Sequence, residues 1–600
     1  MSAIRPSSCP VCAGAGGLEV LSDHLHCRAC GAYSLFPSPG QGRIEQAARR
    51  YQIRMADTDE GFDWRLFFLD LLLEGRGKIE TLGARDSRFE GVAAARGYDL
   101  QAEGERKDAA RALIAWDLLD YDPRPLETLE ACRKRLGDDG LLLLRVRDRG
   151  ADAARRHVPE RRSWGCLNYF ERGTLENLVL QVFGQVPWIV QCPGPEGDML
   201  VAVVDRRRRV SPDGRRVLLI AHPDAFGNID DAPGPRLRIA KTILGLRNEG
   251  WVADLAITAH PHCEGYDLAH LYHHAWRSQD GLAQASRVLY AGIPLVVSTI
   301  YMELSESNFA VEVLPRIFQA WSVEEREALL DNLARGELVT RGSDQPGRIP
   351  VAEPVVEAQR ALFDLADHLV GLSLSEIRTI AHRLGIHRPF TIVPNCADTS
   401  LFTRGSRERF VEKYGVDDFV ISVGHLEPRK NQLMLLYALA DAGLPLVIVG
   451  AANEITRDYQ DLCRYYAPRD TLFISQLPQH ELADAFAAAR VHALPSWNEG
   501  ASLASIEAAM SGCRIVVGDR AGEWEYYRGD AFYCSPASLA SIRRAVLAAW
   551  NDTDSNRSRR LCERFAAEHS FEAHVKATLE AYDDVLCGRR QEVTAEGAHR

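Results

Sequence analysis

Two acidic residues separated by seven positions, Glu499 and Glu507, lie in the segment of the chain with the clearest chemical pattern. Glu499 follows a short apolar run, and a helix that Ser502 or Ser505 can cap is expected to begin just after it. The free amides and the dipole at the start of such a helix attract an anion. Glu507 lies one to two turns into the helix, within reach of a ribose. The pattern therefore indicates an anion site flanked by two carboxylates.

Basic residues follow a second apolar run. The run at 419–423 is typical of a strand buried on both faces of a parallel sheet, and His425, Arg429 and Lys430 come soon after it. Other short apolar runs alternate with helical patterns from about 216 to 590, which indicates right-handed βαβ units and room for two doubly wound domains. These runs lie at 217–221, 255–259, 293–298, 444–449 and 515–517.

Taken in order, five segments resemble glycosyltransferase family 4, the retaining nucleotide-sugar transferases with two Rossmann-like lobes (the GT-B fold). The segments that carry the resemblance are 266–276, 366–376, 391–402, 419–432 and 496–513. The resemblance implies that a sugar moves from a nucleoside-diphosphate sugar to a hydroxyl of a saccharide, a lipid-linked glycan or a protein. It also implies that no catalytic metal takes part, and the pair Asp230 and Asp231 is expected to be a surface turn.

The resemblance assigns roles to individual residues. Glu507 would hydrogen-bond the ribose hydroxyls, and Glu499 would face the hydroxyls of the donor sugar. Lys430, with Arg429 beside it, would neutralise the diphosphate, because positive charge placed where the leaving group gains negative charge lowers the barrier. The other expected donor-binding residues are Gly500, Ala501, Ser502 and Leu503, whose amides would hold the distal phosphate, together with Gly424, His425 and Asn395.

The chain departs from the family at three places, one of which is the Gly-rich loop after the first strand, which is not clear at 221–236. His425 stands where the family usually has an arginine, and a histidine with a pKa of about 6.5 is fully charged only at mildly acidic pH. A neighbouring arginine can compensate for this loss of charge. On the acceptor side, the family often has a histidine after the run at 293–298, where this chain has Tyr301 nearby. Two interpretations of His273 and His274 stay open: residues of the core or cleft, or acceptor-site residues alongside Tyr301.

Four cysteines near the N-terminus form two Cys-x2-Cys pairs, Cys9 with Cys12 and Cys27 with Cys30. Each pair can form a tight turn that offers two thiolates, and four thiolates match tetrahedral Zn²⁺ with no open position. We therefore expect a structural zinc site that stabilises a segment too small to form its own hydrophobic core. A redox-active pair is the alternative. The other cysteines are scattered, which suits reduced thiols in a cytoplasmic protein.

A second resemblance, to the class I S-adenosylmethionine-dependent methyltransferases, rests on segments 78–104, 115–120, 137–145 and 167–175. In that family the first turn carries several glycines, which let the backbone approach the cofactor. This chain keeps only Gly83, whereas Arg85 and Ser87 crowd positions where glycine is expected. Three interpretations stay open: a decayed domain that serves for docking, a working methyltransferase that binds S-adenosylmethionine, or an unrelated α/β domain.

Length and composition fit a multidomain globular protein. A chain of 600 residues suggests about three to six domains. The formal charge is −12, from 71 Lys and Arg against 83 Asp and Glu, which disfavours nucleic acid as a partner. No apolar run is long enough to span a membrane. Contact with a membrane surface is kept as an alternative, although the sequence has no basic amphipathic helix that would support it.

We therefore predict an α/β protein with two Rossmann-like GT-B lobes, an N-terminal Rossmann-like domain of the methyltransferase type and a small zinc ribbon. The expected parts are the zinc module at 1–40, the methyltransferase-like domain at 45–205, a basic linker at 206–216, the acceptor-side lobe at 217–389, and the donor-side lobe with a C-terminal crossover helix at 390–590. Two alternatives compete with the simple transferase. One is a bifunctional glycosyltransferase and sugar methyltransferase, and the other is a catalytically decayed scaffold or glycan-binding protein.

Overall fold

The computed structural model divides the chain into two compact units. Unit 1 comprises Met1–Tyr272 and Ala283–Leu295, and unit 2 comprises His273–Leu282 and Val296–Arg600. In the part of the chain that the structure describes, no helix is both long enough and apolar enough to cross a membrane. The structure describes residues 18–21, 24–27, 33–35, 63–73, 77–82, 86–101, 109–148, 168–194, 197–226, 234–274, 277–320, 322–340, 345–452 and 456–588.

Unit 1 is built on a run of hydrogen-bonded strands in the order β13-β11-β12-β9-β10-β7-β6-β4-β5. Strand β9 pairs in parallel with β12, so that Val190 lies opposite Leu255 and Gln191 opposite Ala256. The sheet of the predicted methyltransferase-like domain therefore continues into the sheet of the predicted acceptor-side lobe. The strands are β4 (Lys78–Leu82), β5 (Asp99–Gln101), β6 (Ala110–Trp116), β7 (Leu136–Arg147), β9 (Trp188–Gly194), β10 (Gly197–Asp205), β11 (Arg216–Ile220), β12 (Val252–Ala256) and β13 (Leu268–Tyr272).

The segment between β10 and β11 makes specific contacts, although the sequence analysis treated 206–216 as an exposed basic linker. Arg206 donates to the carbonyl oxygens of Leu136 and Gly137 at the start of β7, both at 2.9 Å. The next two arginines pair with the Asp205 carboxylate at 2.9 and 2.8 Å. The first part of the charge run is thus held against the sheet by carbonyl and carboxylate oxygens, which the sequence pattern does not reveal.

A small antiparallel sheet in unit 1 contains part of the predicted zinc module. Its order is β1-β2-β3-β8, with β1 (Leu18–Leu21), β2 (His24–Cys27), β3 (Tyr33–Leu35) and β8 (Asn168–Tyr169). Cys27 is the last residue of β2, and Cys9, Cys12 and Cys30 lie outside the described residues. The zinc site therefore stays a prediction. The helices are α2 (Trp64–Leu72), α3 (Ser87–Ala95), α4 (Pro125–Arg135), α6 (Arg172–Phe183) and α7 (Gly234–Asn248); α8 (Ser278–Ala291) has residues in both units.

Unit 2 contains two sets of parallel strands, β14-β15-β16 and a six-stranded sheet in the order β19-β18-β17-β20-β21-β22. Each apolar run predicted from the sequence overlaps a strand of one unit or the other, which confirms an α/β architecture with parallel strands. The strands are β14 (Leu295–Ser298), β15 (His368–Gly371), β16 (Phe390–Ile392), β17 (Phe419–Val423), β18 (Leu446–Val449), β19 (Leu472–Ile474), β20 (Ala489–Leu494), β21 (Arg514–Gly518) and β22 (Phe532–Cys534).

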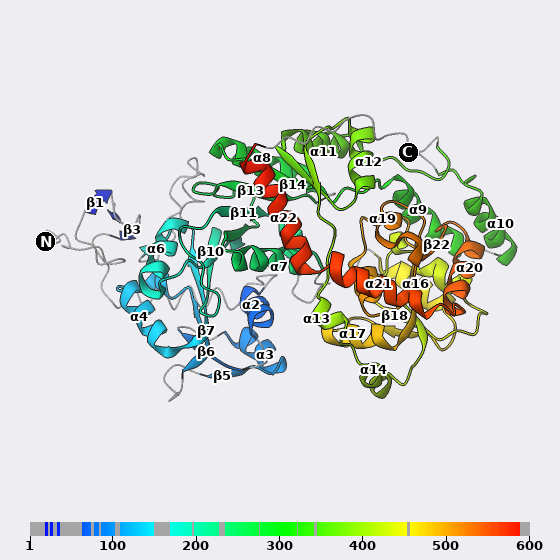
Figure 1. The fold of residues 1–600 in the computed structure, drawn as a ribbon, viewed down its shortest axis with the longest axis horizontal. Coiled ribbons are helices and arrows are strands. Elements are labelled where there is room, and N and C mark those ends of the chain that lie inside the picture. Colours follow the sequence, from blue (N-terminus) through cyan, green and yellow to red (C-terminus); the bar gives the residue numbers. More distant parts are fainter. Residues whose placement is uncertain are drawn as a thin grey trace. The chain divides into compact units, whose positions relative to one another are not determined.

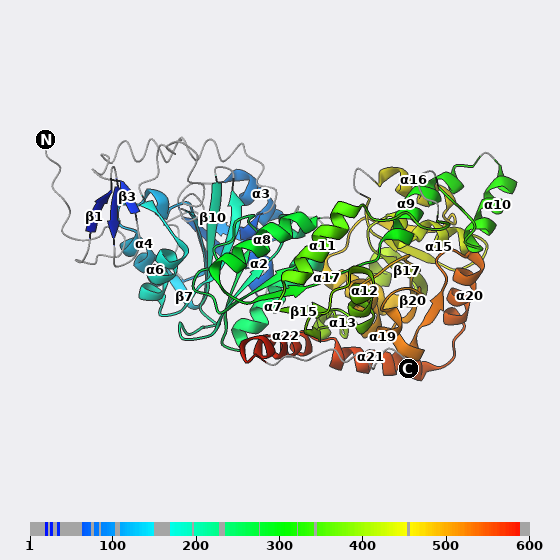
Figure 2. The same ribbon diagram turned by 90° about the horizontal axis from the view of Figure 1, so that it is seen from above.

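Helices cover both faces of the six-stranded sheet (Figure 1). Figure 2 shows α9, α15 and α16 on one side of β17 and β20, with α13, α19 and α21 on the other. Helix α9 comes between β14 and β15 in the chain, yet Phe309 and Phe318 share a hydrophobic cluster with Val420 and Leu433. The helices are α9 (Ser305–Phe318), α10 (Val323–Ala334), α11 (Glu353–Leu365), α12 (Leu374–Leu384), α13 (Thr399–Phe402), α14 (Arg407–Tyr414), α15 (Gln432–Ala438), α16 (Arg457–Tyr466), α17 (Gln479–Ala488), α18 (Leu503–Met510), α19 (Glu523–Tyr527), α20 (Leu539–Trp550), α21 (Ser555–Glu568) and α22 (Phe571–Leu586).

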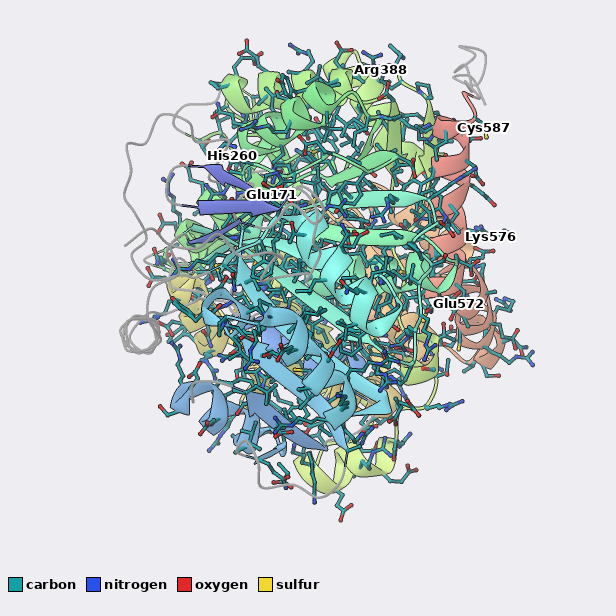
Figure 3. All side chains as sticks on the ribbon, turned by 90° about the vertical axis from the view of Figure 1, so that its left-hand side faces the viewer. Glu171, His260, Arg388, Glu572, Lys576 and Cys587 are labelled. Atoms are coloured by element: carbon teal, nitrogen blue, oxygen red, sulfur yellow. The ribbon has the colours of Figure 1, made fainter. Side chains whose placement is uncertain are left out.

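The C-terminal helix α22 packs against β15 and β16. His574 Nδ1 lies 3.0 Å from the carbonyl oxygen of Pro394, just past β16. Glu572, Lys576 and Cys587 lie toward the outer side of the helix (Figure 3), and Cys587 is an exposed free thiol. This helix is the stretch that the sequence analysis expected to return to the first lobe.

Candidate functional site

The residues of the predicted donor site follow the carboxyl ends of adjacent parallel strands in the six-stranded sheet. Gly424 comes directly after β17, and Glu499 lies in the segment after the neighbouring strand β20. Open α/β sheets bind ligands outside the carboxyl ends of their strands. The predicted residues therefore occupy the edge of the sheet where a ligand site is expected.

The turn into α18 brings the first set of predicted residues together. Ser502 is the N-cap, and its hydroxyl oxygen accepts a hydrogen bond from the Ser505 amide at 3.4 Å. Ala501 has a φ of +155°, a conformation that a residue with a side chain rarely adopts. Its carbonyl oxygen accepts from Asn395 Nδ2 at 2.9 Å. Asn395 therefore braces the strained turn that presents the free amides of α18, from Gly500 onward.

The three predicted catalytic side chains meet in one buried cluster. Lys430 Nζ donates to Glu499 Oε1 at 2.6 Å, and Arg429 Nη1 donates to the same oxygen at 3.1 Å. Burial alone raises the pKa of Glu499, but the two cations outweigh this effect and leave its pKa below the ordinary value. Arg429 also bonds Glu427 at 2.6 Å. Glu499 is thus an ionised carboxylate that holds two cations in place.

Asn431, which the sequence analysis did not single out, fastens this cluster to the strands. It has a φ of +64°, a left-handed conformation that asparagine tolerates better than most residues. Its fully buried side chain donates to the carbonyl oxygens of Pro495 and Pro536, each at 2.9 Å. The Trp497 amide donates to the Arg429 carbonyl oxygen at 2.9 Å. The segments after β17 and β20 are therefore tied to each other next to Lys430.

Two glycines let the segments after β17 and β18 approach each other closely. Gly424 has a φ of +150° and Gly450 a φ of +157°. A Cβ atom on Gly450 would lie 1.9 Å from the Gly424 carbonyl oxygen, which no side chain permits. Gly424 was among the predicted donor-binding residues, whereas Gly450 was missed. The one feature of the sequence that could have identified Gly450 is its position directly after the apolar run at 444–449.

The remaining predicted donor-side residues line the same loops with their side chains more open to solvent. His425 is exposed, and its carbonyl oxygen accepts from Gln432 Nε2 at 2.7 Å. Gly500 and Leu503 are half-buried on either side of the Ser502 cap. A Cβ atom on Gly500 would lie 3.2 Å from Leu372 Cδ1. The groups of this turn that can hydrogen-bond a ligand are therefore its backbone amides.

Glu507 lies on the second turn of α18 and is 9% exposed. Burial raises its pKa to about 8, and a hydrogen bond with Gln479 offsets only part of that effect. No ion pair with Glu507 is found among the residues that the structure describes. The side chain is therefore largely protonated at neutral pH, unlike that of Glu499.

This difference predicts a pH-dependent gain in stability for the variant Glu507→Gln. The folded-state pKa of about 8 exceeds the ordinary 4.5, so wild type loses stability as pH rises from about 4.5 through 8. Glutamine has no such charge, so the variant should gain on the order of 4 kcal/mol over wild type at pH 8 and much less at pH 4. Urea unfolding at both pH values measures this. A gain that does not change with pH would refute it, and the exposed Glu412→Gln is the control.

On the predicted acceptor side, the structure places His273 in the core. It is 3% exposed, with Nδ1 2.6 Å from the Thr299 carbonyl oxygen and Nε2 3.1 Å from Ser278 Oγ. Burial lowers its pKa to about 4, although the bond to Thr299 works in the opposite direction. His273 is therefore a neutral residue with both ring nitrogens within hydrogen-bond distance of a partner. His274 is half-buried.

Tyr301 lies in the loop after β14, and a carboxylate that the sequence analysis missed holds this loop. Glu376 accepts from the Tyr301 amide at 2.5 Å, from Thr299 Oγ1 at 2.7 Å and from the Leu372 amide at 2.5 Å. Ile300, between the two bonded loop residues, has a φ of +38°. Glu376 thus joins the loops after β14 and β15 and fixes the position of Tyr301.

In unit 1, side chains of the protein itself cover the start of α3, near which the methyltransferase resemblance predicts a cofactor. Ser87 is the first residue of α3, and Asp86 is its N-cap. Arg65 Nη2 donates to Asp86 at 2.7 Å and to Asp63 at 2.8 Å. The Arg65 guanidinium lies 4.1 Å from the centre of the Phe89 ring. Gly83 and Arg85 lie outside the described residues.

Comparisons with known proteins converge on the same part of the chain. Residues 406–566 match the family model described as Glycosyl transferases group 1. D-inositol 3-phosphate glycosyltransferase of Corynebacterium aurimucosum is 33% identical over 186 residues, which are 27% of this chain and 44% of that protein. The protein of the same name from Geodermatophilus obscurus is 29% identical over 251 residues, 38% of this chain and 56% of that protein. The chain thus spans about half the length of these curated relatives.

Among solved structures, the chain is similar to a sucrose-phosphate synthase from Thermosynechococcus elongatus, with 15% identity and a TM-score of 0.49 over 62% of this chain and 100% of that chain. It is also similar to Anabaena Alr3699/HepE in complex with UDP, with 14% identity and a TM-score of 0.46 over 62% and 100%. Lys430, Glu499 and Glu507 all lie within 406–566, so the buried charge cluster and the start of α18 belong to the region of this chain that matches the Glycosyl transferases group 1 family.

Proposed function

We propose that the chain is a glycosyltransferase of the family 4 type. It takes a nucleoside-diphosphate sugar as donor and transfers the sugar, with retention at the anomeric carbon, to a hydroxyl of a saccharide, a lipid-linked glycan or a protein. One observation carries the proposal. Lys430 and Arg429 are held by Glu499 in one cluster, in the loops that follow β17 and β20. This cluster precedes the turn into α18, the helix that carries Glu507, and it lies inside the region that matches the family.

The proposed chemistry requires positive charge at the leaving group. When the bond between the anomeric carbon and the diphosphate breaks, negative charge develops on the leaving oxygen. Lys430 and Arg429 are already fixed by Glu499, so little reorganisation is needed when that charge forms. Burial strengthens the interaction, because the effective dielectric constant is lower than in water. Glu499 then has two roles, to position the cations and to face the donor sugar.

Glu507 is assigned to the ribose. The two ribose hydroxyls donate hydrogen bonds, and an ionised carboxylate accepts them better than a carboxylic acid does. Burial keeps Glu507 largely protonated in the free protein at neutral pH. Binding of the ribose should therefore favour loss of this proton.

A thermal-shift panel tests the proposal. Wild type and Glu507→Ala are heated with UDP, GDP, ADP and TDP and with one sugar derivative of each. A ligand at 100 times its dissociation constant adds about 2.7 kcal/mol of stability, enough for a shift of a few degrees. We expect one nucleotide family to stabilise wild type but not Glu507→Ala. If no nucleotide shifts wild type, the decayed scaffold becomes the better interpretation.

For the N-terminal part of unit 1, we propose that the domain no longer binds S-adenosylmethionine. The support is Arg65, which is buried against Phe89 and paired with Asp86 at the start of α3. S-adenosylmethionine added to the same panel should leave the melting temperature unchanged. A shift of several degrees would instead favour the bifunctional enzyme.

A further inference from the structure

One buried carboxyl group beside the Glu499 cluster has no role in the function proposed above. Glu523 is the first residue of α19 and is 4% exposed. Its Oε2 atom is buried and has no hydrogen-bond partner in the described part of the chain. Buried polar atoms nearly always have a partner, because an unpaired one loses the bonds that water would provide. An unpaired carboxyl oxygen beside the Glu499 cluster can therefore accept a hydrogen bond from a ligand group or donate one to it.

Close backbone contacts hold the segment that carries Glu523. A Cβ atom on Gly518, at the end of β21, would lie 2.4 Å from the Ser496 carbonyl oxygen, so this strand end touches the segment that leads to Glu499. A Cβ atom on Gly522 would lie 2.8 Å from Ser373 Oγ. At both positions, any residue larger than glycine would force neighbouring atoms to move. The segment is therefore fixed on both sides before α19 begins.

A carboxylate farther along α19 adds a third attachment. Glu525 accepts from the amides of Leu374 and Ser375, at 2.7 and 2.6 Å, at the start of α12. The backbone on either side of Glu523 is thus held at three points.

The charges around Glu523 determine what it can bind. Burial is the main cause that raises its pKa well above the ordinary value, the Glu499 carboxylate raises it further, and Lys430 lowers it. Lys430 and Arg429 are both engaged with Glu499. The raised pKa favours the protonated form of Glu523, which has one O–H donor and one carbonyl acceptor. A sugar hydroxyl, which also donates and accepts, matches this pattern, whereas a second carboxylate does not.

We propose that Glu523 hydrogen-bonds a hydroxyl of the transferred sugar, next to Glu499, and that the site selects an uncharged sugar over a uronic acid. The inference rests on the proposed function, which places the diphosphate at Lys430. It adds a residue that contacts the sugar and not the nucleotide.

The test separates binding of the sugar from binding of the nucleotide. Calorimetry measures the nucleoside diphosphate identified by the thermal-shift panel, its neutral hexose derivative and its hexuronic acid derivative, on wild type, Glu523→Leu and Glu523→Gln. Leucine removes both hydrogen bonds and suits a buried position, whereas glutamine keeps a donor and an acceptor. Melting temperatures of the variants report whether they fold.

We expect Glu523→Leu to bind the free nucleotide within about twofold of wild type and the hexose derivative about tenfold more weakly, which is a loss of about 1.4 kcal/mol. Glutamine should restore most of the affinity, and wild type should bind the uronic acid derivative at least tenfold more weakly than the hexose derivative. Equal losses for nucleotide and sugar derivative, no loss for either, or equal binding of the uronic acid would overturn the inference.

These outcomes are distinct from failure of the proposed function. If wild type binds no nucleotide, the proposed function and this inference both fall. If wild type binds a nucleotide, Glu507→Ala does not, and Glu523→Leu keeps the wild-type ratio of the two affinities, only the role of Glu523 is refuted.

Discussion

Replacing Lys430 by methionine is expected to lower the turnover number of sugar transfer by about 100- to 1000-fold. Lys430 Nζ lies 2.6 Å from Glu499 and is the compact point charge of the cluster, whereas Arg429 also pairs with Glu427. Methionine keeps most of the length of the side chain and removes the charge. The Michaelis constant for the donor should change less than the turnover number, because charge on the leaving oxygen is largest in the transition state. Steady-state kinetics with the identified donor measures both constants.

The matched control is Lys413→Met. Lys413 is an exposed lysine of α14 that pairs with Glu481 at 2.8 Å, away from the strand ends that hold the cluster. A surface pair of this kind contributes about 1 kcal/mol or less to stability, so the turnover number should stay within about twofold of wild type. A Lys430→Met enzyme that keeps more than about a tenth of the wild-type turnover would remove Lys430 from its assigned role.

The local structure around the candidate site was largely predictable. A strand buried on both faces has no polar alternation, so runs such as 419–423 and 515–517 stand out as strands without any knowledge of their neighbours. The cap at Ser502 was one of two alternatives, because a serine side chain competes well for the free amides at a helix start. The meeting of Lys430 with Glu499 required the family resemblance, since these residues are far apart in the chain.

Contacts between distant segments were not predictable from local patterns. Strand β9 resembles any other buried strand, and nothing in its sequence indicates that β12 is its neighbour. Helix α9 has an apolar face that fits many partners, and the structure shows that this face joins the core of the six-stranded sheet through Phe309 and Phe318. Glu523 was missed for the same reason, because the segment that carries it lies against the distant residues Ser496 and Ser373.

Burial also distinguishes neighbouring residues that look alike in the sequence. His273 and His274 are adjacent, so no pattern distinguishes their environments. The structure buries His273 with both ring nitrogens within hydrogen-bond distance of partners, and desolvation then lowers its pKa to about 4. A histidine that is neutral and fully engaged is suited to packing and not to proton exchange with an acceptor.

Replacing Glu499 by alanine is expected to destabilise the protein by about 3–5 kcal/mol, because two cations then remain in the buried cluster without their shared carboxylate. The Glu499 side chain is 9% exposed, and its partner Lys430 is 13% exposed. The control is Glu427→Ala, which removes a more exposed partner of Arg429 and should cost about 1 kcal/mol or less. Urea unfolding at neutral pH measures both variants.

The double variant Glu499→Leu with Lys430→Met shows why the cluster is retained. Replacing a buried ion pair by apolar side chains of similar size is often neutral or stabilising, so the double variant should regain most of the stability that Glu499→Ala loses. It should still show at least the loss of turnover expected for Lys430→Met alone. That combination means that the protein retains the buried charges for sugar transfer, since an apolar pair of nearly equal stability fits the same space beside Arg429. A double variant as unstable as Glu499→Ala would instead mean that the cluster stabilises the fold.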